Sequence, residues 1–372
     1  MHATRDVVIV GGGVAGCAAV YYLAKAGVRA TLVEREGVGT QASGVSAGGV
    51  NPLHGVPEAL RPLAMESYRL HRGLWDELRQ ATGKDCGGRL STIVRAVYEQ
   101  AEWPELVVVR ETFEATPGFS ARWLDPAEVR ALEPRLTRDL IGALTLHGNG
   151  VVDSYRLTAL LAEAAEKRGA TIRPGEVCGL DRAGGRAARV LLTDGAIACD
   201  AVVLAVGPWA KAAGAWLGVS IPVEPLKGEI LRMRLPGAAL SHDVNAADVL
   251  LMNRAGGQVW CGSTTEWRGF DKAPSEAVRR LLLERAARLM PAMAEAELVE
   301  HTVGLRPVAS DWLPIIGKAP SWDNVYLATG GAKKGILLGP AMGKALADLI
   351  TAGSTPLSIA PFGLERFAHV AV

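Results

Sequence analysis

The sequence lacks the charge imbalance expected of a nucleic-acid-binding protein. Its 40 Lys and Arg residues are matched by 39 Asp and Glu residues, and the formal net charge is +1. Residues of both signs are interspersed, and no basic tract is present. Neither a polyanion nor an anionic membrane surface is therefore an expected ligand.

Long apolar runs and targeting segments are also missing. No uninterrupted apolar stretch is long enough to span a bilayer. The N-terminus has no basic region followed by an apolar segment and a cleavage site. The default expectation is a cytoplasmic protein without an integral membrane segment.

Cysteines do not follow a disulfide or metal-binding pattern. They are odd in number and widely scattered, with no CxxC pair and no His at metal-ligand spacing. We expect them to be reduced and buried, and we predict no metal site. They are Cys17, Cys86, Cys178, Cys199 and Cys261.

Apolar residues are abundant, and the first of them form a βαβ pattern. The 372 residues are 49% hydrophobic, which suffices for a large core and two domains. Residues 7–10 are apolar and β-branched, as in a buried parallel strand, and three glycines follow. Residues 14–26 have helical spacing of apolar side chains, and residues 29–33 predict a second strand that ends at Glu34.

Gly11, Gly13 and Gly16 complete a GxGxxG motif in this unit. They permit, in turn, a tight turn, close approach of the backbone to a pyrophosphate, and close packing of helix on strand. Glu34 stands at the tip of the second strand, where a carboxylate can accept hydrogen bonds from a ribose. Together these features predict a dinucleotide site with its phosphates at the positive end of the helix.

The remaining patterns divide the chain into two discontinuous domains. An α/β, Rossmann-type nucleotide-binding domain is expected to comprise residues 1–86, 146–220 and 304–372. A β-rich, α+β second domain of residues 87–145 and 221–303 is expected to form an antiparallel sheet that roofs a ligand.

Individual elements follow from local periodicity and turn residues. Helices are expected at residues 57–82, 154–169, 275–290 and 336–351, and a short one is opened by Asp125-Pro126. Strands are expected at residues 90–94, 171–174, 201–206, 229–235, 249–253, 258–262 and 325–328.

A second junction of glycines and a helix lies near the end of the chain. The strand at residues 325–328 runs into the sequence TGGAKKG, and the helix at 336–351 follows directly. Free amides at a helix start carry positive potential, and Lys333 and Lys334 add to it. An electron-rich group is therefore expected there.

These motifs resemble the FAD-dependent D-amino-acid oxidase superfamily, and in overall layout its glycine oxidase and sarcosine oxidase branch. The likeness runs almost end to end: VVIVGGGVAG, ASGVSAGG, LEP, VVD, AVGPW, PLKGE, GLRPVASDWLPIIG and GGAKKGILLGPAMG. The resemblance implies noncovalent FAD, held by both glycine-rich ends of the chain. No Cys or His stands at a position expected for a covalent link to the flavin.

The resemblance assigns FAD contacts to particular residues. Val14 and Ala15 would lie at the phosphate turn, Glu34 and Arg35 at the adenosine ribose, and Val177 at the adenine. The full set comprises Gly11, Gly13, Val14, Ala15, Gly16, Glu34, Arg35, Ala42, Ser43, Ala47, Gly48, Gly49, Val177, Gly207, Gly331, Lys333, Lys334, Gly335, Ile336 and Leu337.

In this family an arginine holds the substrate carboxylate, and the matching position is Arg306. A guanidinium suits that role because it grips a carboxylate with two parallel hydrogen bonds. Arg306 and Lys333 are the expected catalytic residues. The expected substrate contacts are Asn51, His54, Met252, Arg306, Trp312 and Lys333.

Three departures from the glycine oxidase pattern affect the expected substrate. Lys333 stands in place of an arginine, and Trp312 in place of a glycine. Residues 250–252, Leu-Leu-Met, stand where a tyrosine is usual. A more apolar pocket and a substrate other than glycine are therefore compatible with the sequence.

The implied reaction is removal of hydride from the α-carbon of a small amine or amino acid, giving an imine. In an oxidase, O2 would reoxidise the flavin and release H2O2. Two alternatives remain open: a dehydrogenase of an amino acid or 2-hydroxy acid with a quinone or protein acceptor, and a flavin-holding subunit of a hetero-oligomer. No catalytic base is assigned, and a homo-oligomer is compatible with the sequence.

Overall fold

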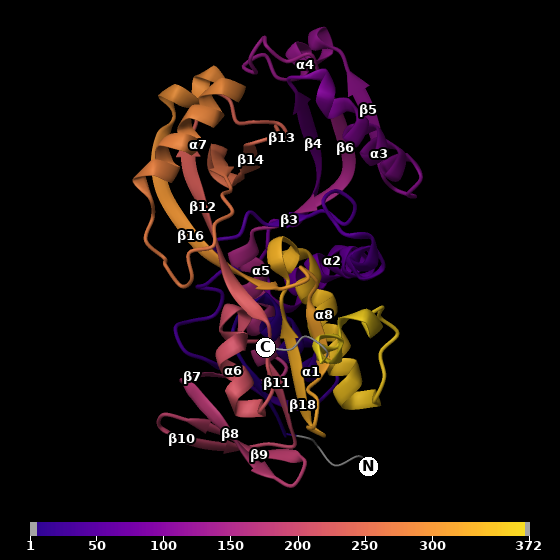
Figure 1. Cartoon of the computed structure of the whole chain (residues 1–372), viewed down its shortest axis with the longest axis vertical. Helices are drawn as coiled ribbons and strands as arrows, with labels where there is room; N and C mark the ends of the chain where they lie inside the picture. Colours follow the sequence, from indigo (N-terminus) through magenta and orange to yellow (C-terminus); the bar gives the residue numbers. More distant parts are fainter. Residues whose placement is uncertain (1–5, 369–372) are drawn as a thin grey trace.

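The computed structural model describes residues 6–368, which form two halves along one long axis (Figure 1). One half is built on a six-stranded, mainly parallel sheet and the other on a nine-stranded, mainly antiparallel sheet. This confirms the expected fold class, an α/β nucleotide-binding part and a β-rich part that are both discontinuous in sequence.

The first sheet places the predicted βαβ unit at its centre. The order is β17 (Ile315–Lys318), β18 (Val325–Thr329), β11 (Ala201–Leu204), β1 (Asp6–Val10), β2 (Arg29–Glu34) and β7 (Thr171–Pro174). Only β17 runs antiparallel to its neighbour. Four of the five residues of β1 are buried, as expected for a parallel strand covered on both faces.

A group of packed helices lies beside this sheet (Figure 1). They are α1 (Val14–Lys25), α2 (Arg61–Thr82), α5 (Ser154–Glu166) and α8 (Gly335–Ala352). α1 packs on α5 and α8, and α2 packs on the same two helices. A shorter helix, α6 (Ala210–Leu217), follows the turn after β11.

The second sheet forms the other half and reaches down to the first. Its order is β16 (Glu297–Ala309), β12 (Val223–Arg234), β15 (Gln258–Gly262), β14 (Leu250–Arg254), β13 (Asp243–Asn245), β4 (Arg89–Val97), β6 (Gly142–Val151) and β3 (Gly49–Val50), with β5 (Ser120–Leu124) on β6. β13 and β4 are parallel, so the sheet is mixed. The long strands β12 and β16 extend into the first half (Figure 1).

Three helices cover the outer side of this sheet. α3 (Trp103–Glu114) and α4 (Pro126–Leu132) pack on β5 and β6, and α7 (Glu276–Leu289) packs on β12 and β15. Asp125 caps α4 as its sequence indicates, accepting hydrogen bonds from the amides of Ala127 and Glu128.

The expected domain boundaries stay a prediction. Strands β6 and β16 run through two of these boundaries, at residues 146 and 304.

Several elements were not predicted from the sequence, among them β6, α3 and a third sheet. α3 occupies a stretch for which no element was expected; Val107 and Val108 are exposed, and only Leu106 and Phe113 of this helix are buried. A separate three-stranded antiparallel sheet of β8 (Val177–Ala183), β9 (Arg186–Leu192) and β10 (Gly195–Ala198) lies beyond β7.

The expectation that all cysteines are buried was wrong for two of them. Cys178 is exposed because it lies on an outward-facing position of β8, and Cys199 is half-buried after β10. All five cysteines are free. Within residues 6–368, no group of three or more His, Cys, Asp or Glu residues could hold a metal ion.

One helix of the described chain meets the length and hydropathy criteria for a membrane span. Residues Ala332–Ala352 form a helix that is long and apolar enough by length and composition. An 18-residue window of this segment is 67% buried inside the protein, where α8 packs against α1 and α2. Its apolar character therefore has a structural cause in the core.

α8 runs parallel to α1 at a distance that only glycine permits. A Cβ at Gly339 would lie 2.7 Å from the side chain of Val14, and one at Gly343 would lie 2.4 Å from the backbone of Ala19. Gly339 and Gly343, four residues apart on α8, therefore meet Val14 and Ala19, five residues apart on α1. The first residue of α1 thus lies beside the fifth residue of α8, and the start of α8 extends about one turn beyond that of α1.

We predict that Gly343→Ala destabilises the protein by about 1–3 kcal/mol, because the added methyl must push α8 away from the α1 backbone. The matched control is Gly73→Ala. Gly73 lies inside α2, and a methyl group added there would enter open space, so this change should stabilise by about 0.5–1 kcal/mol. Chemical denaturation of both variants measures the difference. Equal effects of the two substitutions would contradict the close helix contact.

Candidate active site

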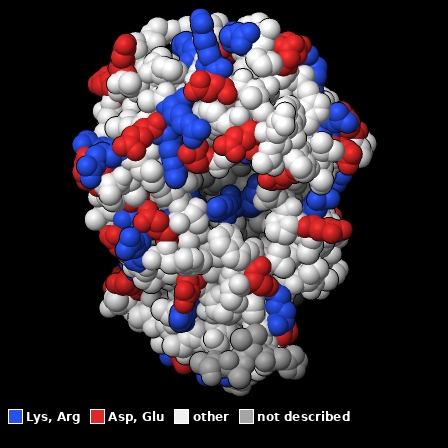
Figure 2. All heavy atoms as spheres, turned by 45° about the horizontal axis from the view of Figure 1, so that its top comes forward, with Lys and Arg blue, Asp and Glu red and all other residues white. Residues whose placement is uncertain are grey.

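A cavity of about 590 Å³ lies between the two halves, in the size range of small-molecule sites. Lys and Arg atoms lie inside a hollow of the surface (Figure 2). The wall includes the starts of α1 and α8, the end of β2, the turn after β11, and residues of β12, β13, β14 and β16. Its cationic side chains are Arg35, Arg254, Arg306, Lys333 and Lys334.

The start of α1 closes one end of the cavity. Gly11 has a φ of +107° and a Cβ there would lie 2.4 Å from the Ala205 carbonyl oxygen, so the turn requires glycine. The amide of Val14 donates to Ser43 Oγ at 3.0 Å. Gly16 does not line the cavity, and a Cβ there would lie 1.9 Å from the Gly11 oxygen. The motif thus combines an open turn with close helix packing.

Glu34 is held at the edge of this end by backbone amides. Its Oε2 accepts from the amide of Gly12 at 2.6 Å, and its Oε1 accepts from the amide of Glu36 at 2.8 Å. The carboxylate lines the cavity in this fixed position. Its remaining lone pairs can accept hydrogen bonds from the hydroxyls of a ribose.

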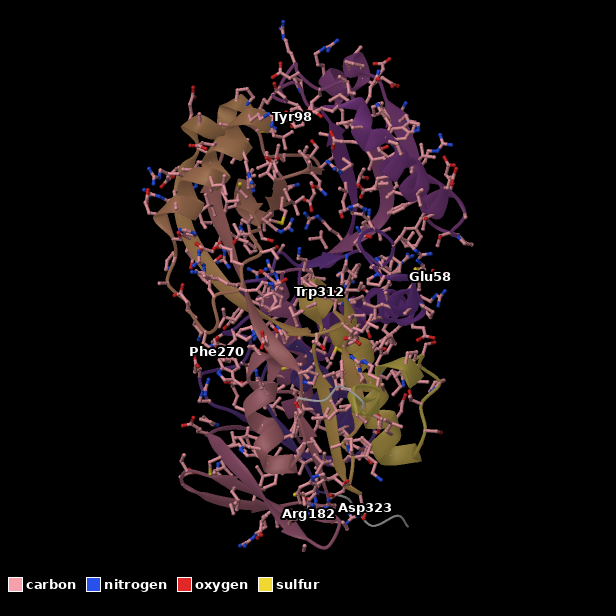
Figure 3. The ribbon with its side chains drawn as sticks, viewed as in Figure 1. Glu58, Tyr98, Arg182, Phe270, Trp312 and Asp323 are labelled. Carbon is pink, nitrogen blue, oxygen red and sulfur yellow. The ribbon has the colours of Figure 1, made fainter. Side chains whose placement is uncertain are left out.

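Two aromatic and two cationic side chains cover the end of the cavity near Glu34. The Trp209 ring lines the cavity and stacks on Phe270, with 5.6 Å between ring centroids. The Arg35 guanidinium lies 5.0 Å from the Trp209 centroid and Lys272 Nζ lies 5.7 Å from it. Phe270 belongs to the segment between β15 and α7 (Figure 3). This segment therefore joins the two halves beside the cavity.

The loop before β3 lines the middle of the cavity with small residues. Ala42, Ser43, Ala47 and Gly49 are among them. Gly48 is not, because its φ of +74° turns the backbone against Val152, and a Cβ there would lie 2.0 Å from the Val152 oxygen. Such a wall of small side chains leaves room for a broad, flat ligand.

The start of α8 also lines the cavity. Lys334 Nζ donates to the His54 carbonyl at 2.8 Å. Burial, and then the nearby charge of Lys333, lowers the pKa of Lys334 to about 8. Burial, and then the charge of Arg306, also lowers the pKa of Lys333. Two ammonium groups thus add positive potential to the amino end of a helix.

His54 lies beside this end and is neutral at pH 7. Burial is the main reason that its pKa falls to about 4, and the charges of Lys334 and Arg95 contribute. Within the described residues, its Nδ1 is buried without a hydrogen-bond partner. A neutral imidazole of this pKa is a weak proton acceptor.

Arg306 reaches the cavity from β16 and has no carboxylate partner within residues 6–368. Its Nη1 donates to the Thr264 carbonyl at 3.0 Å, and its Nη2 donates to Ser263 Oγ at 2.9 Å. Burial lowers the pKa of Arg306 to about 10, so the guanidinium remains charged at pH 7. The guanidinium lies over Gly228 of β12, where a Cβ would be 2.2 Å from Nη1.

Trp312 lies where the two halves meet (Figure 3), but it does not line the cavity. Its φ of +63° is unusual for a bulky residue, and the residue is 40% exposed. Its ring packs edge-on against Trp267 at 6.2 Å and lies 5.9 Å from Lys333 Nζ. Trp312 therefore lies next to Lys333 but outside the cavity lining.

Several cavity residues of the second half were not predicted. Arg254 Nη1 pairs with Asp243 Oδ1 at 3.2 Å, and Arg254 also donates to the Ala47 carbonyl. Asn245, Ser263 and Gly228 line the cavity as well. The sequence carries only a weak signal for them, a charged or polar residue at the end of an apolar strand. The strand register decides which of them face the cavity.

The cavity brings together most of the predicted site residues, although their individual roles stay predictions. Gly16, Gly48, Leu337 and Trp312 lie outside its lining. The predicted residues in the lining are Gly11, Gly13, Val14, Ala15, Glu34, Arg35, Ala42, Ser43, Ala47, Gly49, Asn51, His54, Val177, Gly207, Met252, Arg306, Gly331, Lys333, Lys334, Gly335 and Ile336.

This arrangement fits FAD. The glycine turn at α1 can receive phosphates, Glu34 can bind a ribose, and the start of α8 can receive an electron-rich ring. No cysteine is among the lining residues of the described part of the chain. A noncovalent cofactor remains the prediction.

Comparison with known proteins supports the cofactor assignment. Residues 6–349 match the family model described as FAD dependent oxidoreductase. The chain is 36% identical over 367 residues to a glycine oxidase from Geobacillus kaustophilus, covering 97% of both chains. It is 28% identical to a D-amino acid dehydrogenase from Paramagnetospirillum magneticum, covering 97% and 98%. A crystal structure of glycine oxidase from Geobacillus kaustophilus superposes with a TM-score of 0.91 at 33% identity, covering 98% and 99%.

We predict that Gly228→Ala displaces the Arg306 guanidinium, because the added methyl would occupy its position. The affinity for a simple carboxylate such as acetate or glycolate, measured by perturbation of the flavin absorbance, should fall about tenfold or more. Gly179→Ala is the matched strand control, since its methyl would make only ordinary contact with Leu191 at 3.6 Å. Unchanged carboxylate affinity in Gly228→Ala would show that Arg306 does not bind the anion.

Proposed function

The chain belongs to the FAD-dependent oxidoreductase family and is an FAD-binding enzyme, and on that premise we propose that it oxidises a small amine or amino acid. The substrate loses two electrons and two protons from its C–N unit and becomes an imine. We propose O2 as the electron acceptor, with release of H2O2. A cytoplasmic location remains part of this proposal.

The main support for this proposal is the position of Arg306 in the cavity wall. Its side chain is a charged guanidinium, and its two hydrogen bonds go to a carbonyl and a hydroxyl. Such a group retains the capacity to bind a carboxylate, and the low dielectric of the cavity strengthens that attraction. An amino-acid carboxylate supplies the missing negative charge.

Bound FAD supplies the two-electron acceptor for the oxidation. The protein's contribution is to bind and orient the substrate between Arg306 and the start of α8. Lys333, whose pKa is lowered by burial and by Arg306, stands close enough to strengthen the positive potential on the same anion. Roof residues Met252 and Ile230 supply apolar wall around the substrate.

Neither His54 nor Lys334, which both line the cavity, is a strong general base at pH 7. His54 is neutral with a pKa of about 4, held down by burial. Lys334 donates to a backbone carbonyl. The proposed reaction therefore requires a substrate amine that is already deprotonated when it binds, so its rate should rise with pH as that amine loses its proton.

A dehydrogenase is the second candidate, because one relative with nearly full coverage is a D-amino acid dehydrogenase. In that case the electrons of the reduced flavin pass to a quinone or a protein acceptor. The substrate-binding role of Arg306 is the same for both candidates, and only the acceptor differs.

The test is anaerobic titration of the purified yellow protein with D- and L-amino acids, glycine, N-methylated amino acids and 2-hydroxy acids. We predict that an amine of this panel bleaches the flavin absorbance and that air restores it with formation of H2O2. Bleaching that persists in air but reverses with a quinone would favour the dehydrogenase. A flavin that no member of the panel bleaches, with a second chain co-purifying, would favour the subunit hypothesis.

We predict that Arg306→Leu raises the apparent KM for the bleaching substrate roughly 30- to 800-fold, equivalent to about 2–4 kcal/mol, while FAD stays bound. Arg306→Lys should recover part of the loss, because an ammonium keeps the charge without the paired hydrogen bonds. Arg234→Leu is the control, since Arg234 pairs with Glu297 on the exposed part of β12. Near-normal kinetics of Arg306→Leu would remove Arg306 from the substrate site.

A further inference from the structure

Pro340 interrupts the hydrogen-bond ladder of α8 near its start. Proline has no N–H, so the carbonyl of Ile336 has no partner four residues later, and the proline ring crowds that carbonyl. The gap lies one turn after Gly335 and Ile336, which line the cavity. The sequence of α8 alone therefore leaves its cavity-facing end incompletely bonded.

Two side chains of α2 fill this gap. Ser67 Oγ donates to the Leu337 carbonyl at 2.6 Å and accepts from the Ala341 amide at 3.2 Å, so its hydroxyl is inserted into the ladder. His71 Nε2 lies 2.9 Å from the Ile336 carbonyl oxygen and 3.2 Å from that of Leu337. Because both neighbours are acceptors, Nε2 carries the proton and donates it.

Both side chains are fully buried. Their hydrogen bonds to α8 offset the free-energy cost of removing these polar groups from water. Burial lowers the pKa of His71 to about 4, and its imidazole is therefore neutral at pH 7. Its Nδ1 is buried without a partner within the described residues. Within the described residues, His71 is thus hydrogen-bonded only through Nε2, the ring nitrogen that faces α8.

We propose that Ser67 and His71 are positioning residues that act through the first turn of α8 to raise the affinity and the reduction potential of the bound FAD. The carbonyl of Ile336 belongs to the same peptide group as the amide of Leu337, which at a helix start has no partner within the helix. A donor on the carbonyl polarises this peptide group and strengthens the positive end of the helix. This role rests on the proposed place of the flavin against residues 331–337.

A purely structural role would give a different result. The same hydrogen bonds could stabilise the α2–α8 contact without affecting the cofactor. Thr82 provides the matched comparison, because it is a buried residue of α2 whose hydroxyl donates to the Leu78 carbonyl at 2.7 Å. Thr82→Val removes this bond on the same helix without touching α8.

The experiment is titration of the oxidised holoenzymes with sulfite, which adds to oxidised flavin more tightly as the flavin potential rises. Ser67→Ala and His71→Leu should each weaken sulfite binding about tenfold, which for a two-electron couple corresponds to about 30 mV. FAD affinity should fall in the same variants. His71→Gln should restore sulfite binding to near the wild-type value, because its amide can still donate. Thr82→Val should lower the unfolding temperature and leave sulfite binding unchanged.

Loss of thermal stability in Ser67→Ala and His71→Leu with unchanged sulfite affinity and potential would overturn the proposal. If His71→Leu fails to yield holoenzyme, the double variant His71→Leu/Pro340→Ala decides, because alanine at 340 returns an N–H that can bond the Ile336 carbonyl within the helix. Recovery of yield and sulfite affinity in this double variant supports the proposal, and losses that persist there contradict it. Sulfite binding and the potential need no substrate, so both remain measurable if the proposed oxidase activity is absent.

Discussion

The parallel contact between α1 and α8 is the constraint on which the rest of the site depends. Gly339 and Gly343 let α8 approach the α1 backbone so closely that both helices start at one cavity. The amino ends of both helices carry positive potential, which stabilises an electron-rich ligand in the cavity. A dinucleotide with its phosphates near one helix and its ring near the other fits this arrangement.

A second constraint comes from the long strands β12 and β16, which cross from the roof into the nucleotide-binding half. Their antiparallel register pairs Gly228 with Gly304 and sets Arg306 diagonally across from Gly228. The missing Cβ at Gly228 makes room for the guanidinium, and Ser263 and Thr264 fix its direction. The same strands thus join the two halves and present the cation that the proposed substrate requires.

The two ends of the site differ in how far the sequence predicts them. The nucleotide end depends on residues close together in the chain, so the GxGxxG turn, α1, β2 and Glu34 follow from local patterns. The roof depends on pairing between distant strands. Arg254 and Asp243 therefore could not be placed at the cavity in advance, and the exposed Val107 and Val108 obscured the helical spacing of α3.

Local sequence patterns predicted the α/β class, the central βαβ unit, the helix near the end of the chain and part of the cavity lining. That Gly16, Gly48 and Leu337 pack behind the lining, and that Trp312 stands outside it, became evident only in the folded chain. The physical reason is that turns and helix starts are set by neighbouring residues, whereas exposure to a cavity is set by contacts across the chain. The insertion of Ser67 beside Pro340 is such a contact, between residues more than 270 positions apart.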